Sequence, residues 1–401
     1  MAKPEIRLKG FEGEWEKFEL NQIFQERHVI STITPDLPQL SFTIEEGIIK
    51  PENRKSNKRD FLIKDKTNKK YLVTLLNDII YNPANVIHGA IHKNRLCNGV
   101  VSPIYKIFYT DQNADFIDCV VRRKSFIREI SKYMEGTVLK LRTLKPESFL
   151  NISIYIGSTI EQNIIASFFQ HLDSQIQSTT KKIESLKQVK IASLQSMFPQ
   201  AGETAPRVRF KGFDGKWEMK LLSNLLIERN EKYPKTLEFP LKAFIANIGV
   251  ADKGERYDRS ALINDVENKL YKRTYKGDFI YSSNNLETGS IGLNNHGNAC
   301  ISPVYSIFFC TDIADSNFIG YRLTRKDFIK EMIKWRQGVM YGQWRIHEDD
   351  FLKISLLVPT KEEQELIGNY FRTLDKQISL EEQKLEKLKQ IKAACLDKMF
   401  V

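Results

Sequence analysis

Two copies of one segment set the architecture of this chain: EQNIIASFFQHLDSQIQSTTKKIESLKQVKIASLQSMF at residues 161–198 and EQELIGNYFRTLDKQISLEEQKLEKLKQIKAACLDKMF at residues 363–400. The copies are displaced by 202 residues, and each carries apolar residues alternately three and four positions apart. That spacing is the heptad pattern of a coiled-coil helix. The apolar stripes consist of Ile165, Phe169, Leu172, Ile176, Ile183 and Leu186 in the first copy and of Ile367, Phe371, Leu374, Ile378, Leu385 and Leu388 in the second.

These stripes predict that the two helices pair with each other. Polar residues interrupt both stripes at matching positions, Thr179 with Glu381 and Lys190 with Lys392. An isolated helix would leave its stripe in water, so we expect the two copies to pair within one chain. A self-complementary pairing implies a two-fold axis across the helices, which would then run antiparallel. Pairing between separate chains is the alternative, and it predicts concentration-dependent dimers.

The repeat extends beyond the helices. Residues 4–23 return as 206–225, each with a Gly-Phe-x-Gly-x-Trp motif, and patches of residues 78–91 and 102–108 return 200 residues later. Between these patches the two halves differ, which indicates related domains with different targets. Strand-like runs at 79–81, 103–109, 278–282 and 301–309, with helical spacing at 123–134 and 325–336, predict an α+β fold. Its two related mixed α/β domains would be separated by the two long antiparallel helices.

The amino-acid composition limits the classes of protein to which this chain can belong. A hydrophobic fraction of 41% over 401 residues is enough for two ordinary cores. No apolar run is long enough to span a bilayer, and the first residues lack the apolar region of a signal peptide. The five cysteines form no C-x-x-C pair, which favours reduced thiols in a cytoplasm.

The net charge of +11 is concentrated in part in one segment. Between Lys50 and Lys70 lie nine basic residues against three acidic ones, and the second half has a weaker basic cluster between Lys253 and Lys276. Such clusters are typical of phosphate contact in nucleic-acid binding. The alternative is a solvated loop in a generally basic protein.

The sequence contains no complete catalytic motif of the types considered below. The segment Asn82-Pro83-Ala84-Asn85 lacks the second proline and the aromatic residue of an adenine methyltransferase loop. Residues 249–254 have Walker spacing without the phosphate-binding lysine. His88 and His92 lie four residues apart, but in a strand-like stretch without a third ligand. We therefore expect a chain that binds and does not catalyse, with no metal or cofactor of its own.

Taken together, these motifs resemble the specificity subunit of a type I restriction-modification system. The resemblance rests on the Gly-Phe-x-Gly-x-Trp segments ending at Trp15 and Trp217, on Phe-x-x-Leu-Asp-x-x-Ile in each helix, and on Leu-Lys-Gln leading to Met-Phe. It covers essentially the whole chain. The first half departs from the pattern at the joint to its helix, where Ser148 and Gly157 stand in the places of Asp350 and Pro359.

The resemblance implies a division of labour along the chain. Residues 1–156 and 201–358 would be target-recognition domains, each reading one half of a bipartite, asymmetric DNA site. Residues 157–200 and 359–401 would be spacer helices that fix the gap. Two methyltransferase subunits, which use S-adenosylmethionine, would dock on this scaffold, and two restriction subunits requiring ATP and Mg²⁺ would join them in systems that also cleave DNA.

The candidate DNA-binding residues lie in one segment of each half. They are Arg54, Lys55, Asn57, Lys58 and Arg59 in the first half and Arg336, Gln337, Tyr341, Gln343 and Arg345 in the second. Their side chains can contact bases or phosphates, although residues of this kind also make ordinary surface. Two other classes stay open: a self-sufficient DNA-modifying enzyme of unrecognised fold, and a basic coiled-coil adaptor that binds RNA.

Overall fold

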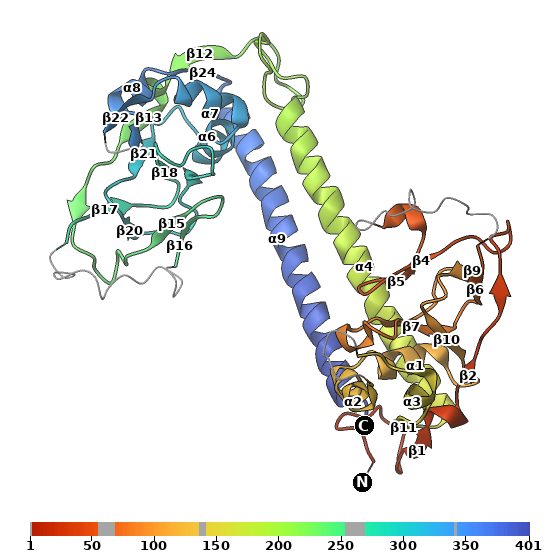
Figure 1. Cartoon of the computed structure of the whole chain (residues 1–401). Helices are drawn as coiled ribbons and strands as arrows, with labels where there is room; N and C mark the ends of the chain where they lie inside the picture. Colours follow the sequence, from red (N-terminus) through yellow and green to blue (C-terminus); the bar gives the residue numbers. More distant parts are fainter. Residues whose placement is uncertain (1, 55–68, 136–141, 253–268, 341–342) are drawn as a thin grey trace. The chain divides into compact units, whose positions relative to one another are not determined.

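The chain folds into two compact units. The computed structural model describes residues 2–54, 69–135, 142–252, 269–340 and 343–401. Unit 1 comprises Met1–Thr180 and Gln383–Val401, and unit 2 comprises Lys181–Glu382. Each unit therefore contains one globular part and about half of each long helix, α4 (Thr159–Ser196) and α9 (Lys361–Lys398) (Figure 1). The predicted α+β fold with two long helices and an internal repeat is confirmed.

The globular part of unit 1 is built on short antiparallel strands. Its four-stranded sheet has the order β2-β10-β7-β8, and a three-stranded sheet has the order β3-β6-β9. Two-stranded pairs join β4 to β5 and β1 to β11. The strands are β1 (Glu16–Glu19), β2 (Gln25–Glu26), β3 (Ile30–Ser31), β4 (Ser41–Thr43), β5 (Gly47–Ile49), β6 (Tyr71–Thr74), β7 (Ile79–Tyr81), β8 (Ile91–Lys93), β9 (Gly99–Val101), β10 (Lys106–Tyr109) and β11 (Ser153–Ile156).

Unit 2 repeats this topology strand for strand. Its sheets have the orders β13-β21-β18-β19, β14-β17-β20, β15-β16 and β12-β24, and a further hairpin pairs β22 with β23. The strands are β12 (Glu218–Leu221), β13 (Leu226–Glu228), β14 (Lys232–Tyr233), β15 (Ala243–Ile245), β16 (Gly249–Ala251), β17 (Tyr271–Thr274), β18 (Phe279–Tyr281), β19 (Ile291–Leu293), β20 (Ala299–Ile301), β21 (Ser306–Cys310), β22 (Gln337–Met340), β23 (Gln343–Arg345) and β24 (Ser355–Val358).

Short helices cover the four-stranded sheets at corresponding places. They are α1 (Ala114–Val121), α2 (Lys124–Tyr133) and α3 (Pro146–Leu150) in unit 1, and α5 (Leu222–Leu225), α6 (Ser316–Leu323), α7 (Lys326–Ile333) and α8 (Glu348–Leu352) in unit 2. Single 3-10 turns occur at Leu20–Gln22, Pro51–Asn53 and Val86–His88. The helices predicted over 123–134 and 325–336 correspond to α2 and α7.

Two of the predicted strands are shorter than the sequence indicates. The runs 103–109 and 301–309 each contain a Ser-Pro-x-Tyr turn, so the strands begin only at Lys106 and Ser306. Proline has no amide hydrogen for a sheet ladder, and it favours the second position of a tight turn. A hydrophobic run alone therefore overestimates strand length wherever proline follows serine.

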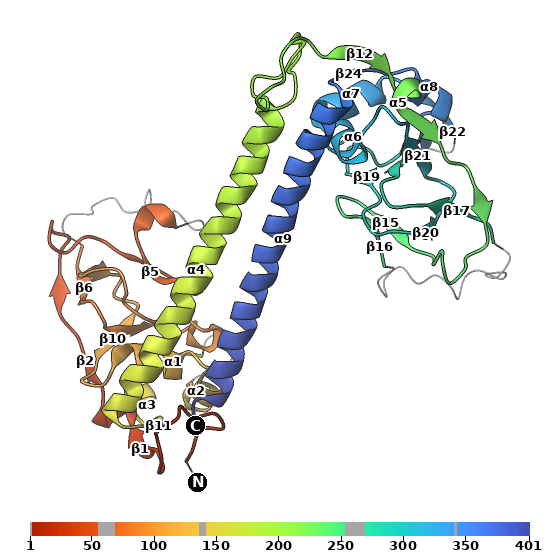
Figure 2. The ribbon, with the colours of Figure 1, turned by 180° about the vertical axis from the view of Figure 1, so that it is seen from behind.

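Within each unit the two helix halves lie side by side and antiparallel, as both views show (Figure 2). In unit 2, Lys182 pairs with Glu381, and Lys190, further along α4, pairs with Asp375, which is earlier on α9. In unit 1 the corresponding pair joins Lys392 to Asp173. The lysines that interrupt the predicted stripes are thus paired with the opposite helix.

The stripe residues lie against the partner helix or a globular core. Ile165, Phe169, Leu172, Ile183, Ile367, Phe371, Leu374, Ile378 and Leu388 are buried, and Ile176, Leu186 and Leu385 are partly buried. The alternative pairing between separate chains is not needed to cover them.

The end of each long helix completes the core of the opposite repeat. Phe400, at the end of α9, contacts Trp15, Phe116 and Phe169 in unit 1. Its copy Phe198, at the end of α4, makes the equivalent contacts in unit 2 with Trp217, Phe318 and Phe371. Each unit therefore depends on residues encoded about 200 positions away from its own globular part.

Buried charge clamps hold the first segment of each repeat on its long helix. Arg7 donates two hydrogen bonds of 2.8 Å to Glu161, and Arg209 donates two, of 2.8 and 2.6 Å, to Glu363. Both carboxylates are almost completely buried, so their pairing with arginine offsets the cost of removing them from water. The clamps fix where each globular part meets its helix.

Candidate nucleic-acid interface

A groove of about 880 Å³ in unit 2 gathers several of the predicted DNA-binding residues. Strands β13, β14 and β17, the turn before β21 and the hairpin β22–β23 all contribute to it. We call this site the groove, and it is lined by Glu228, Asn230, Lys232, Lys272, Ser283, Asn284, Pro303, Val304, Ser306, Gln337, Gly338, Trp344, Arg345, Ile346, His347, Glu348 and Asp349.

Contacts with the core fix the hairpin on one side of the groove. The Tyr281 hydroxyl lies 3.4 Å from the Ile346 carbonyl oxygen, and the Ile346 amide donates to the Ser283 hydroxyl at 3.1 Å. Arg336, just before β22, donates to the Ser283 carbonyl oxygen and to Glu287. The base of the hairpin is therefore held by the sheet.

Two lysines stand directly opposite each other in the groove. Lys232 of β14 pairs in register with Lys272 of β17, and like charges at such positions oppose each other. Burial lowers the pKa of Lys272, and the charge of Lys232 adds to that shift, whereas Glu348 and Glu228 counteract it. Burial raises the pKa of Glu228, and the nearby Glu348 carboxylate does the same. The carboxylates of Glu228, Glu348 and Asp349 thus share the groove with the cations of Lys232, Lys272 and Arg345.

Large side chains project from the outer strand of the hairpin. Trp344 is 45% exposed and Arg345 is 65% exposed. The Arg345 guanidinium lies 3.7 Å from the Glu348 carboxylate, a weak surface pairing that leaves its donors accessible. An accessible guanidinium beside an indole face suits contacts with bases and phosphates.

The corresponding surface of unit 1 has the same backbone but different side chains. Its hairpin bridge, Glu135 to Thr143, matches the pairing of Gln337 with Arg345, and Tyr81 bonds the Leu144 carbonyl oxygen as Tyr281 does that of Ile346. The strand pair Ile30–Leu72 replaces the two lysines. Other replacements are Lys106 for Ser306, Arg142 for Trp344, Thr143 for Arg345 and Pro146 for Glu348.

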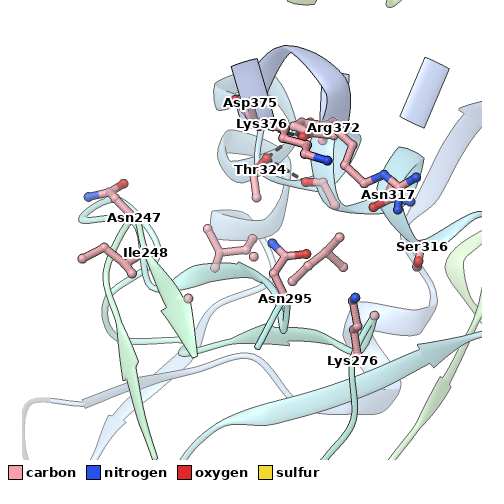
Figure 3. Close-up of a pocket in the computed structure, with 17 residues that line it drawn as sticks. Asn247, Ile248, Lys276, Asn295, Ser316, Asn317, Thr324, Arg372, Asp375 and Lys376 are labelled. Atoms are coloured by element: carbon pink, nitrogen blue, oxygen red, sulfur yellow. Dashed lines mark hydrogen bonds between the residues drawn. The ribbon is translucent and has the colours of Figure 1, made fainter. Parts of the chain in front are cut away.

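Unit 2 also has a second hollow, of about 670 Å³, between α6, α9 and strands β16 and β19 (Figure 3). Lys276 and Asn295 lie on one side of it, and Arg372, Asp375 and Lys376 of α9 lie on the other. Asp375 is engaged by Lys190 and by the Tyr321 hydroxyl. The remaining lining is mainly polar.

In unit 1 an ionic network occupies the corresponding position. Lys93 and Arg95 pair with Asp115, and Arg95 also pairs with the buried Asp118. His92 is buried beside them, with Nε2 2.6 Å from the Ile44 carbonyl oxygen. Unit 2 has glycine at two of these positions, Gly292 for His92 and Gly320 for Asp118, which opens the hollow.

Comparison with known proteins identifies the family. Residues 215–390 match the family described as the type I restriction modification DNA specificity domain. This segment holds most of the globular part of unit 2, with the groove, and most of α9, and the first half of the chain repeats the same topology. The second repeat, residues 215–390, therefore belongs to the family of type I restriction modification DNA specificity domains.

A solved structure of a specificity subunit shares the fold over the full length of the chain. The type I restriction-modification S subunit from M. genitalium matches with a TM-score of 0.59 and 14% identity, covering 100% of this chain and 99% of that one. The HsdS subunit from Thermoanaerobacter tengcongensis matches with a TM-score of 0.46 and 14% identity, covering 96% of each chain. No curated protein sequence matches this chain.

The groove contains two of the predicted DNA-binding residues, Gln337 and Arg345. The Gln337 amide donates to Asp350 at 2.6 Å, and Arg336 is not part of the lining, since its guanidinium is bonded to the Ser283 carbonyl oxygen and to Glu287. Gln343 belongs to β23, and nothing is described of its side chain. Tyr341 lies outside the described residues. The role of these residues in DNA binding stays a prediction.

In unit 1 of the specificity subunit only one predicted residue can be placed. Arg54 follows the turn Pro51–Asn53, and its charge opposes the rise that burial causes in the pKa of Tyr105. Lys55, Asn57, Lys58 and Arg59 lie outside the described residues.

Sequence reasoning missed Lys232, Val304 and Trp344 as lining residues of the groove, and it included Lys272 only as one member of the basic cluster between Lys253 and Lys276. Lys232 and Lys272 are 40 positions apart, and only the pairing of β14 with β17 brings them together. The available signal was their mismatch with the apolar residues Ile30 and Leu72 in the other repeat. Trp344 could have been found in the same way, since Arg142 takes its place.

The described residues of the specificity subunit show no group of three His, Cys, Asp or Glu side chains placed to hold a metal ion. None of the described helices has the length and hydrophobicity needed to cross a membrane. Specificity subunits supply DNA recognition in their systems rather than catalysis.

Proposed function

We propose that this specificity subunit reads a bipartite, asymmetric DNA site, with unit 1 contacting one half-site and unit 2 the other. One observation supports this above all: the two units share a core and a topology but differ in nearly every side chain around the groove. Features that are the same in both repeats should bind what is common to both half-sites. Features that differ should bind the bases that differ.

The groove is the proposed base-reading surface of unit 2. Arg345 and Gln337 carry the donors and acceptors that recognise guanine and adenine edges, and Lys232 supplies charge for a phosphate. Trp344 offers an apolar face to a base or sugar. In unit 1, Arg54 and the basic segment after it would serve the same purpose with a different set of side chains.

The long helices are proposed to serve as spacer and scaffold. The predicted division, with residues 1–156 and 201–358 as readers and 157–200 and 359–401 as spacer helices, assigns the gap between half-sites to α4 and α9. Methyltransferase subunits would dock on this scaffold, two per specificity subunit, and two restriction subunits would join them in a system that also cleaves DNA.

The specificity subunit itself is proposed to be non-catalytic and to need no cofactor. S-adenosylmethionine, ATP and Mg²⁺ would belong to the partner subunits. The proposal also includes a cytoplasmic location, where the partners and the DNA are found. Methyl transfer or DNA cleavage by the purified chain alone would contradict the non-catalytic part of this proposal.

Methylome sequencing tests the function in one experiment. Cells carrying this chain and its methyltransferase partner should methylate adenines in two short, different sequences separated by a fixed number of base pairs. Cells with the methyltransferase alone are the control and should lack these marks. Methylation at a single undivided sequence, or binding to RNA without a fixed gap, would contradict the proposal.

A further inference from the structure

An exposed apolar residue stands at the tip of the same turn in both units. The turns are Ser102-Pro103-Ile104-Tyr105 and Ser302-Pro303-Val304-Tyr305. Ile104 is 59% exposed and Val304 is 73% exposed. Both tips are β-branched, so their side chains are stiff at the first torsion.

The turns are held rigidly. In each, the tyrosine amide bonds the serine carbonyl oxygen, at 3.2 Å in unit 1 and 3.3 Å in unit 2. Proline fixes one backbone torsion of the turn. Tyr105 is buried against Phe42, and the Tyr305 ring packs on Phe244 in the same way. The fold therefore presents an aliphatic group to solvent at a defined place.

The tips adjoin the proposed DNA-binding surfaces. Val304 lines the groove together with Lys232, Trp344 and Arg345. In unit 1 the equivalent turn, with Ile104 at its tip, precedes β10 as the turn of Val304 precedes β21. A partner that reaches Lys232 and Arg345 also reaches the tip, and the match of the second repeat to a DNA specificity domain makes a DNA duplex the partner expected there.

The repeat itself indicates what the tips contact. The surrounding side chains differ between the units, but the aliphatic tip is present in both, so its contact should not depend on the bases of either half-site. An aliphatic side chain cannot pair with a phosphate. It can press against stacked bases and sugars, as apolar wedge residues of other DNA-binding proteins do.

We propose that Ile104 and Val304 are sequence-independent apolar contacts that press on the base stack of the two DNA half-sites. This inference rests on the proposed function, because it requires each unit to engage DNA. Arg345 and its neighbours would then determine which bases are accepted, and the tips would add affinity for any duplex that is seated in the groove.

The test uses the full chain assembled with its methyltransferase partner. Val304→Ser is compared with Val304→Ile, which keeps the apolar tip, and with Leu237→Ser, which changes a fully exposed leucine outside the groove. Binding is measured on a duplex with the methylated site and on a shuffled duplex of equal length. Val304→Ser should weaken binding to both by about tenfold with an unchanged preference, and both controls should bind like the wild type.

A fluorescent base analogue locates the contact. 2-Aminopurine placed along each half-site should brighten at one step when the wild-type complex binds, because unstacking relieves its quenching. Val304→Ser should abolish the signal in the half-site of unit 2, and Ile104→Ser should abolish it only in that of unit 1.

Unchanged binding by Val304→Ser would overturn the inference. So would a loss of methyltransferase assembly with normal DNA affinity, which would make the tip a protein contact. If the wild-type complex shows no preference between the two duplexes, the proposed function fails. In that case the inference about the tips is still tested, because it requires Val304→Ser to weaken binding to the shuffled duplex.

Discussion

Unit 1 and unit 2 share their interior and differ at the surfaces that face a ligand. The stacked rings Tyr81 and Phe108 in unit 1 return as Tyr281 and Phe308 in unit 2, with nearly parallel planes in both. Around the groove, by contrast, Ile30 and Leu72 become two lysines. Core packing therefore maintains the same fold in both units, while the side chains that line the groove can differ. A protein whose two domains recognise different DNA sequences needs this combination.

A second difference lies beneath the surface. Unit 1 fills the space beside its long helix with paired charges, whereas unit 2 leaves a hollow there. The fold accommodates both arrangements because neither leaves a buried charge without a partner. In unit 1 the charges pair with one another, and in unit 2 the hollow is open and polar. Stability of the two units should therefore respond differently to the same kind of substitution.

The greatest loss of stability should follow from replacing Phe400 or Phe198, the rings that complete the core of the opposite repeat. Phe400→Ala should destabilise unit 1 by about 3–5 kcal/mol, since it leaves a cavity among Trp15, Phe116 and Phe169. Hydrogen exchange resolved by peptide would show the loss in strands β7 and β10. Phe198→Ala is the matched variant and should instead affect β18 and β21. If Phe400→Ala reduced protection only in unit 2, or Phe198→Ala only in unit 1, the assignment of these residues would be wrong.

The next effect concerns base reading. Arg345→Ala should weaken discrimination at one base of one half-site by about 1–3 kcal/mol, because it removes an accessible guanidinium from the groove of unit 2. Competition binding with single-base variants of the site measures this. The preference at the other half-site should stay as in the wild type. A uniform loss across all sequences would assign Arg345 to a phosphate.

A smaller effect distinguishes the two buried tryptophans. Trp15 Nε1 donates to Glu161 at 3.0 Å, while Trp217 Nε1 has no hydrogen-bond partner among the described residues. Trp15→Phe should therefore cost about 0.5–1.5 kcal/mol more than Trp217→Phe in urea unfolding. Equal costs would show that the hydrogen bond contributes nothing to the difference between the units.

The smallest effect is a dependence on pH that only unit 1 should show. Burial lowers the pKa of His92 below its ordinary 6.5, and Arg122 and Arg95 add to that shift, whereas the Ile44 carbonyl and Asp118 oppose it. The unfolded chain then binds the proton more readily, so unit 1 should lose stability as the pH falls through and below 6.5. Gly292 takes this position in unit 2.

Hydrogen exchange, corrected for intrinsic rates, measures this effect at pH 7 and pH 5. Protection of β8 should fall more than that of β19. His92→Gln is the control, because it removes the titrating group and keeps a polar side chain at the Ile44 carbonyl oxygen. Persistence of the difference in that variant would show that another group is responsible.

The helices and the repeat could be predicted from the sequence because heptad spacing and duplicated motifs are local signals. The clamp between Arg7 and Glu161 could not, since it joins residues 154 positions apart. Strand ends were missed where Ser-Pro turns interrupt apolar runs. The groove was predicted only in part, because charge and amide content mark Arg345 and the basic cluster that includes Lys272, but not Lys232, the cross-strand partner of Lys272.

The most direct test of the account exchanges groove residues between the repeats. A chain carrying Trp344→Arg and Arg345→Thr has the residues of unit 1 at these positions of unit 2, and it would be expressed with the methyltransferase partner for methylome sequencing. If each unit reads its own half-site, one half of the methylated site should change while the other half and the gap stay the same. A site that is unchanged in both halves, or changed in both, would contradict the claim that each unit reads its own half.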